Sequence, residues 1–131
     1  MTQEADYAVR IVYSLAKDGA RQGSKQISDR AGVSLRFSLK ILRKLVTAGI
    51  LKSYKGNRGG YELARAAEDI TLNDVIETID GPYAINRCLR GGHDCTLDSA
   101  EGCHFRAVYA EISDDIRNRL NSVTFARLME S

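Results

Sequence analysis

Apolar residues recur at helical spacing near the start of the chain. Within residues 4–17 they follow the i, i+3, i+4, i+7 spacing of an amphipathic helix, at Ala5, Ala8, Val9, Val12 and Ala16. Gly19 follows as a stop signal. The pattern therefore predicts a first helix with one face in a core.

Two further helices are predicted directly after it. Residues 25–31 form a short helix for which Ser24 is the expected N-cap, and Gly32 breaks it. Ser34 then caps a longer helix over 35–48. A short helix, a glycine turn and a second capped helix predict a helix-turn-helix.

The longer helix of this pair has two faces. We expect an inward apolar face of Phe37, Ile41, Leu42 and Leu45, and an outward polar face of Arg36, Lys40, Arg43 and Thr47. Leu35 and Leu39 fit two interpretations, because each could close the core or contact a thymine methyl group.

A β-hairpin is predicted after the helix pair. Residues 50–54 and 61–63 are β-prone, and Lys55-Gly56-Asn57-Arg58-Gly59-Gly60 between them supplies the positive-φ positions of a hairpin tip. Two cations in the tip suit a wing that reaches over the DNA backbone into a minor groove. A hairpin in this place predicts a winged helix.

The second half of the chain begins with a helix and ends with one. Thr71 to Asp74 resembles a capping box, and Gly81-Pro82 ends the helix that follows. A narrow apolar stripe then suits pairing with another helix, at Phe105, Tyr109, Ile112, Ile116 and Leu120. The predicted fold is mainly α with a small β-hairpin wing, namely a winged helix-turn-helix plus a long C-terminal dimerisation helix. Its parts are 1–82 for DNA binding, 83–103 for a cysteine-bearing loop, and 104–131 for the dimerisation helix and a C-terminal tail.

The distribution of charge favours a nucleic-acid partner. The chain carries a formal net charge of only +2, but residues 25–58 hold nine basic residues against the single acid Asp29. This segment therefore carries +8 inside an otherwise acidic chain, as expected for phosphate contact.

The composition describes an ordinary soluble domain. Of the residues, 44% are hydrophobic and 27% are charged, and no apolar run approaches the ~20 residues that span a bilayer. The first residues lack the basic region of a signal peptide, so we expect a cytoplasmic protein without a membrane partner.

All three cysteines of the chain lie in one polar, glycine-rich stretch. Cys88, Cys95 and Cys103 have a C-x6-C-x7-C spacing, unlike the paired C-x2-C of structural zinc modules. Three interpretations compete: an iron–sulfur cluster, a zinc ion with a fourth ligand, and a cofactor-free thiol switch. Catalysis is disfavoured, because only His93 and His104 could serve a cysteine nucleophile as base. An electron carrier would explain the cysteines but not the basic segment.

Several motifs together resemble the IscR/NsrR/RirA family of bacterial iron–sulfur transcriptional regulators, also called the Rrf-two family. The motifs are Asp6 to Arg10, Ile27 to Ser34, Lys55 to Tyr61, Thr71 to Ile76 with Gly81-Pro82, and the three cysteines. The resemblance covers nearly the whole chain. It implies a winged-helix DNA reader that dimerises through its long C-terminal helix and binds a double-stranded operator as a homodimer.

The resemblance also implies a set of cluster ligands. The cysteines of the family match Cys88, Cys95 and Cys103, which would hold a [2Fe–2S] or [4Fe–4S] cluster. IscR-type members use a histidine at the position of Arg106, which cannot ligate iron. NsrR-type members use an acid of the partner subunit's first helix, which corresponds to Asp6. Nitric oxide, oxygen, redox state and iron or cluster supply are the signals compatible with this family.

The DNA contacts follow from the helix, the wing and the family. We expect Ser34, Arg36 and Lys40 to act on the recognition helix, and Lys55 and Arg58 on the wing. IscR has a base-reading glutamate at the position that corresponds to Leu39, so we expect this chain to bind a different operator sequence.

Overall fold

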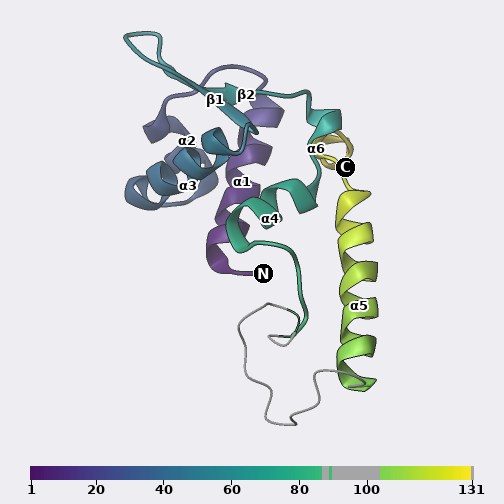
Figure 1. Ribbon diagram of the computed structural model, residues 1–131. Coiled ribbons are helices and arrows are strands. Elements are labelled where there is room, and N and C mark those ends of the chain that lie inside the picture. Colours follow the sequence, from purple (N-terminus) through teal and green to yellow (C-terminus); the bar gives the residue numbers. More distant parts are fainter. Residues whose placement is uncertain (87–88, 90–103, 131) are drawn as a thin grey trace.

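The computed structural model describes residues 1–86, 89 and 104–130 of the chain. Figure 1 shows a compact group of helices that carries the hairpin at one end and a long helix on the opposite side. The described part contains six α-helices, one short 3-10 helix and one two-stranded sheet. The predicted fold class, mainly helical with a hairpin wing, is confirmed.

Three helices form the N-terminal half. They are α1 (Gln3–Asp18), α2 (Ser24–Ala31) and α3 (Leu35–Thr47). The α1 helix packs on both others, and all three bury apolar side chains in one core. That core stabilises the helix-turn-helix, because neither α2 nor α3 alone is long enough to be stable in water.

The ends of these helices explain where the chain turns. Gly32 adopts a φ of +70° between α2 and α3, a conformation that glycine accepts without steric cost. The Ser34 side chain accepts a hydrogen bond from the Phe37 N–H at 3.3 Å, so its predicted N-cap is confirmed. The prediction for Ser24 is wrong, because α2 begins at Ser24 and Gly23 is the N-cap, with no side-chain hydrogen bond.

The buried face of α3 differs from the prediction by one position. The inward side chains are Ser38, Ile41, Leu42 and Leu45, which follow the i, i+3, i+4, i+7 spacing. Phe37 lies beside this stripe and is 51% exposed, so the inward position predicted for it is wrong. A serine takes the expected place of the aromatic ring, and Phe37 instead contacts the Tyr7 ring edge-on at 6.3 Å between centroids.

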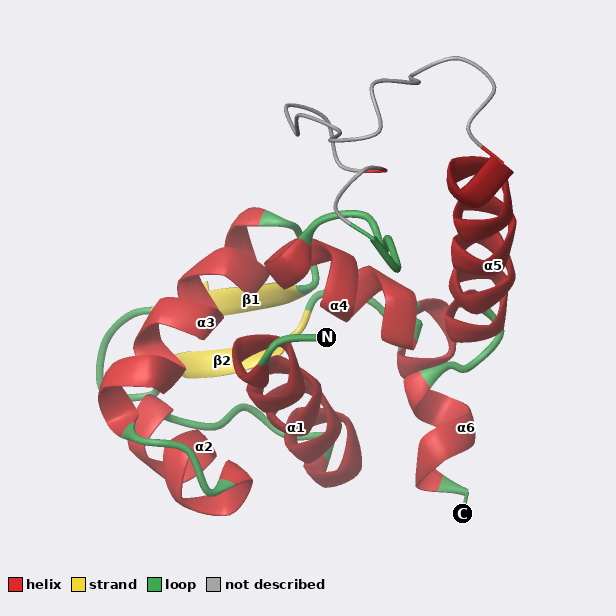
Figure 2. Cartoon of the chain, turned by 90° about the horizontal axis from the view of Figure 1, so that it is seen from below, coloured by secondary structure: helices red, strands yellow, loops and turns green. Residues whose placement is uncertain are grey.

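The wing is an antiparallel hairpin of β1 (Leu51–Tyr54) and β2 (Gly60–Leu63), with Leu51 opposite Leu63. Figure 2 shows its two strands beside α3. A third segment joins β2, since Gln22 and Tyr61 exchange two backbone hydrogen bonds of 2.8 and 3.0 Å. These bonds tie β2, near the tip of the wing, to the linker between α1 and α2.

The chain then returns to the core through η1 (Ala67–Asp69) and α4 (Leu72–Asp80). The predicted capping box of α4 is confirmed. The Thr71 side chain accepts from the Asp74 N–H at 3.1 Å, and the Asp74 carboxylate accepts from the Thr71 N–H at 3.0 Å. These two bonds satisfy N–H groups that the first turn leaves unpaired.

The last two helices are α5 (His104–Asn121) and α6 (Phe125–Met129). The long α5 packs on α4, and α6 reaches α1 and η1. Phe125 of α6 is completely buried in the main core. The predicted C-terminal tail therefore contains a helix that packs on the main core. No helix of the described residues is long and apolar enough to cross a membrane.

Candidate nucleic-acid interface

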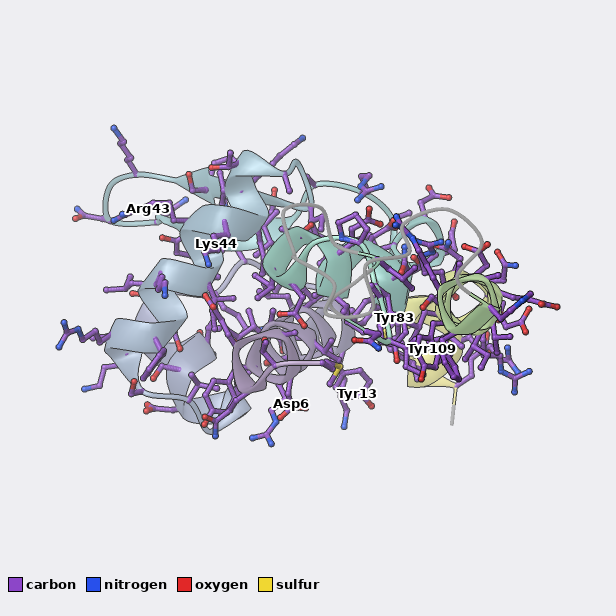
Figure 3. All side chains as sticks on the ribbon, turned by 60° about the horizontal axis from the view of Figure 1, so that its bottom comes forward. Asp6, Tyr13, Arg43, Lys44, Tyr83 and Tyr109 are labelled. Atoms are coloured by element: carbon purple, nitrogen blue, oxygen red, sulfur yellow. The ribbon has the colours of Figure 1, made fainter. Side chains whose placement is uncertain are left out.

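The outer face of α3 is basic and exposed. Arg36, Lys40 and Arg43 lie on the side opposite the buried stripe. Figure 3 shows Arg43 and Lys44 on this helix, well separated from Asp6 on α1. The predicted recognition residues Arg36 and Lys40 are one helical turn apart and face the same way. Such a row of cations can contact phosphates or base edges in a major groove.

The neighbouring acid Glu4 fixes one edge of this face. Its carboxylate pairs with Lys44 Nζ at 2.9 Å and lies 3.8 Å from Lys40 Nζ. The Lys40 side chain nevertheless remains 59% exposed, so it can turn toward a phosphate. Ser34, at the start of the helix, uses its hydroxyl oxygen as the cap, which leaves its O–H free to donate.

The tip of the wing holds the other two predicted DNA contacts. Lys55 and Arg58 are both exposed there. The tip bends sharply at two glycines. A Cβ on Gly59 would lie 2.6 Å from the Tyr54 carbonyl oxygen, and Gly60 has a φ of +143° beside Gln22. Glycine is required at both positions. Figure 1 shows the hairpin tip and α3 on the same side of the molecule, away from α5.

Arg21 braces the wing, and the sequence patterns did not single it out. Its guanidinium lies 3.4 Å from the centroid of the Tyr54 ring and donates to the Arg58 carbonyl oxygen at 3.1 Å. It also faces Glu62 at 3.7 Å. Arg21 therefore links the α1–α2 linker to both strands and to the tip, a set of contacts that only the folded hairpin brings together.

Tyr54 and Glu62 form the polar part of this brace. The Tyr54 hydroxyl donates to the Glu62 carboxylate at 2.6 Å. This hydrogen bond raises the pKa of Tyr54 above its ordinary value, and the nearby Arg21 charge opposes the shift. Tyr54 thus stays a neutral donor at physiological pH and holds the two strands in register.

The predicted metal-ligating cysteines Cys88, Cys95 and Cys103 lie outside the described residues. Within the described part, no group of three or more His, Cys, Asp or Glu side chains is placed to hold a metal ion. Asp6, the predicted fourth ligand, lies in the first turn of α1 with its side chain 40% exposed. Its carboxylate pairs with Arg10 at 2.8 Å, and the Arg10 guanidinium also stacks on Tyr7.

Described residues just before the three cysteines contact the rest of the fold. Asp80, at the end of α4, accepts hydrogen bonds from the backbone N–H and the hydroxyl of Thr2, at 2.9 and 2.5 Å. The Tyr83 carbonyl accepts from Arg117 of α5, and Figure 3 shows Tyr83 beside that helix. The chain that leads into the cysteine segment therefore contacts both the N-cap of α1, the helix that carries Asp6, and α5, the predicted dimerisation helix.

The apolar stripe of α5 is exposed along one edge only, because Tyr109, Ile116 and Leu120 are half-buried in the single chain. Phe105 is 62% exposed and Ile112 is 37% exposed. The Phe105 and Tyr109 rings stack along the stripe with centroids 6.5 Å apart. The buried Ser113 lies next to the stripe, and its hydroxyl accepts from the Ile85 N–H at 3.0 Å, so the half-buried edge of the stripe faces its own domain.

Comparisons with known proteins agree with this architecture. A family model described as an iron-dependent transcriptional regulator, Rrf2, matches residues 1–131. An rrf2-like HTH-type regulator of Rhodobacter capsulatus is 37% identical over 86% of this chain and 80% of its own length. The transcriptional regulator IscR of Vibrio atlanticus is 30% identical over 99% of this chain and 75% of its own length.

Solved structures show the same fold. CymR, described as the global cysteine regulator of B. subtilis, has a TM-score of 0.80 at 25% identity and covers 99% of this chain and 95% of its own. IscR of T. potens has a TM-score of 0.76 at 25% identity, with coverages of 99% and 85%. Transcriptional regulators, not enzymes, make up this family. The chain therefore belongs to the Rrf2 family of DNA-binding transcriptional regulators.

Proposed function

We propose that this regulator binds a double-stranded operator as a homodimer, and that an iron–sulfur cluster controls the binding. DNA binding is supported by the exposed row of Arg36, Lys40 and Arg43 on the outer face of α3. This row lies on the same side of the molecule as the wing. Ser34, Arg36 and Lys40 contact the major groove, while Lys55 and Arg58 contact the backbone and the minor groove.

The homodimer is proposed from the exposed edge of the α5 stripe. A stripe headed by Phe105 and Ile112 leaves large apolar side chains in water unless another surface covers them. A second copy of α5 offers the same narrow seam. Two subunits joined in this way present two recognition helices to two half-sites, about one helical turn of DNA apart.

The cluster is proposed to bind Cys88, Cys95 and Cys103, with Asp6 of the partner subunit as the fourth ligand. The chemistry of the donor set fits, because thiolates are the usual ligands of these clusters. The exposed carboxylate of Asp6 supports its role, since its ion pair with Arg10 lies at the surface and can be exchanged for another partner. When bound, such a cluster supplies a centre that reacts with oxidants or nitric oxide.

The chain's own residues provide the route from this centre to DNA. Asp6 lies on α1, and α1 packs directly on α3. Glu4, two residues earlier in the same helix, pairs with Lys44 of α3. A change in the position of α1 therefore alters the support of the recognition helix, which is a two-state coupling in the sense used for allostery.

Metal analysis separates this proposal from its rivals. Protein purified without oxygen is expected to be brown and to contain iron and acid-labile sulfide. Colourless protein with stoichiometric zinc would contradict the cluster. Metal-free protein whose operator binding changes only on thiol oxidation would show the cofactor-free thiol switch instead.

Replacement of Asp6 tests the fourth ligand. Asp6→Ala is expected to change the visible spectrum of the cluster or to shorten its lifetime in air severalfold, because one iron loses its protein ligand. Glu68→Ala removes an exposed acid of η1 and serves as the matched control. An unchanged spectrum and lifetime in the Asp6 variant would remove this residue from the ligand set.

Replacement of Arg58 tests the wing. Arg58→Ala is expected to weaken operator binding and to lower the slope of log K against log salt by about one, because one phosphate contact is lost. Arg127→Ala, which removes an exposed cation on α6, should leave both quantities unchanged. Equal effects of the two variants would mean that only overall charge matters and that the wing makes no specific contact.

A further inference from the structure

Two large leucines are exposed on the recognition helix. Leu35 and Leu39 of α3 are 44% and 41% exposed, so they do not close the core as Ile41, Leu42 and Leu45 do. They lie one turn apart on one edge of the helix, in its first two turns. Exposed leucines in this place cost free energy in the free protein. A bound partner that covers them would recover it.

The surroundings of these leucines identify the kind of partner. The basic residues Arg36, Lys40 and Arg43 lie next to them on the outer face of the same helix. Leu39 also borders a hollow of about 260 Å³ between α3 and the hairpin, together with Arg43, Val46, Thr47, Ser53 and Tyr61. An apolar edge framed by cations suits an anionic surface that presents small apolar groups.

A protein partner is a weaker match for this edge. Figures 1 and 2 both place α3 and α5 on opposite sides of the molecule, so the proposed dimer stripe lies elsewhere. The other exposed apolar residue of the helix, Phe37, lies on the opposite edge against Tyr7. The leucine edge is thus a separate surface, and it lies at the end of α3 that meets base edges in helix-turn-helix proteins.

We propose that Leu35 and Leu39 read the 5-methyl groups of thymines in the major groove, an inference that rests on the proposed operator binding. The methyl group of thymine is the only apolar group that a base presents there. A leucine has no hydrogen-bonding group, so it distinguishes thymine from the other bases through this methyl group alone. The half-site is therefore expected to contain thymines opposite the first two turns of α3.

Deoxyuridine provides a direct test, because it lacks only the methyl group and pairs as thymine does. The operator is first selected from random duplexes with the full-length protein, in whichever cofactor state binds DNA. Each thymine of the enriched site is then replaced singly by deoxyuridine, and binding is measured by fluorescence anisotropy. At one position or more in each half-site, the replacement is expected to lower the affinity of the protein about fourfold. This is the cost of leaving one methyl-sized apolar group exposed to water.

Variants of the protein assign the effect to its residue. In Leu35→Ala or Leu39→Ala, thymine and deoxyuridine at the sensitive position should bind equally well, whereas Phe37→Ala should keep the difference. All three side chains are exposed, so circular dichroism and thermal unfolding should show folded protein in each case.

The possible failures are distinguishable. Selection that enriches no sequence would overturn the proposed operator binding together with this inference. An enriched operator without any thymine-sensitive position would overturn the inference alone. A methyl effect that persists in both leucine variants, or that disappears in Phe37→Ala instead, would also overturn it.

Discussion

Phe125→Ala is expected to lower the free energy of unfolding by about 3–5 kcal/mol, the usual cost of deleting a fully buried aromatic side chain. Phe125 is completely buried in the main core, far along the chain from the other core residues. Its backbone N–H donates to the Ile70 carbonyl oxygen at 3.0 Å, so the backbone of α6 cannot easily shift to fill the cavity that the missing ring leaves. A loss of this size is a large share of the stability of a small domain.

Chemical denaturation followed by circular dichroism measures this effect. Met129→Ala provides the control, because Met129 belongs to the same helix and is exposed. Its replacement should change the stability by no more than about 0.5 kcal/mol. Equal, small effects of both substitutions would mean that α6 does not close the core. A large effect of Phe125→Ala alone would establish that the last residues belong to the DNA-binding domain.

The same residue shows where the sequence patterns fall short. Apolar periodicity predicts helices that are long enough to repeat it, and α1, α3, α4 and α5 were all found in this way. The α6 helix has only five residues, which is too short for a periodic signal. Its position depends on contacts with Ile70 and α1, and such long-range contacts leave no local pattern.

Local capping chemistry, in contrast, was predicted correctly at Ser34 and Thr71, although not at Ser24. Ser34 and Thr71 each have a side-chain oxygen near an unpaired helix N–H, so the start of each helix is specified by a few neighbouring residues. The inward face of α3 was harder, because Ser38 takes a fully buried position that apolar patterning assigns to Phe37. A polar residue in a core position is invisible to a hydrophobicity pattern.

The residues of the candidate site also differ in whether local sequence alone predicts them. The exposed basic residues of one helix or one hairpin, such as Arg36 and Arg58, can be predicted from the sequence. Arg21 does not, because its contacts with Tyr54 and the Arg58 carbonyl exist only after the hairpin folds against the linker. The role assigned to Asp6 came from family resemblance, since a ligand supplied by a second subunit has no spacing rule within one chain.

Ile112→Asp is expected to separate the proposed dimer and to reduce affinity for the complete operator by roughly 100-fold or more. The substitution places a charge in the middle of the α5 stripe, where the partner's helix would exclude water from it. Ile112 is 37% exposed in the single chain, so the fold itself should tolerate the change. The loss of affinity follows from effective concentration, because a subunit bound at one half-site no longer holds a second subunit near the other.

Sedimentation equilibrium and titration of DNA containing one or two half-sites test this expectation together. Asn118→Asp adds the same carboxylate to an exposed position of α5 away from the stripe, and it should remain dimeric with full affinity. In the Ile112 variant, binding to a single half-site should be nearly unchanged, while the advantage of the second half-site disappears. A variant that stays dimeric would place the dimer contact elsewhere. A monomeric variant with full operator affinity would show that the two half-sites are not bound jointly, and the apolar stripe would then need another partner.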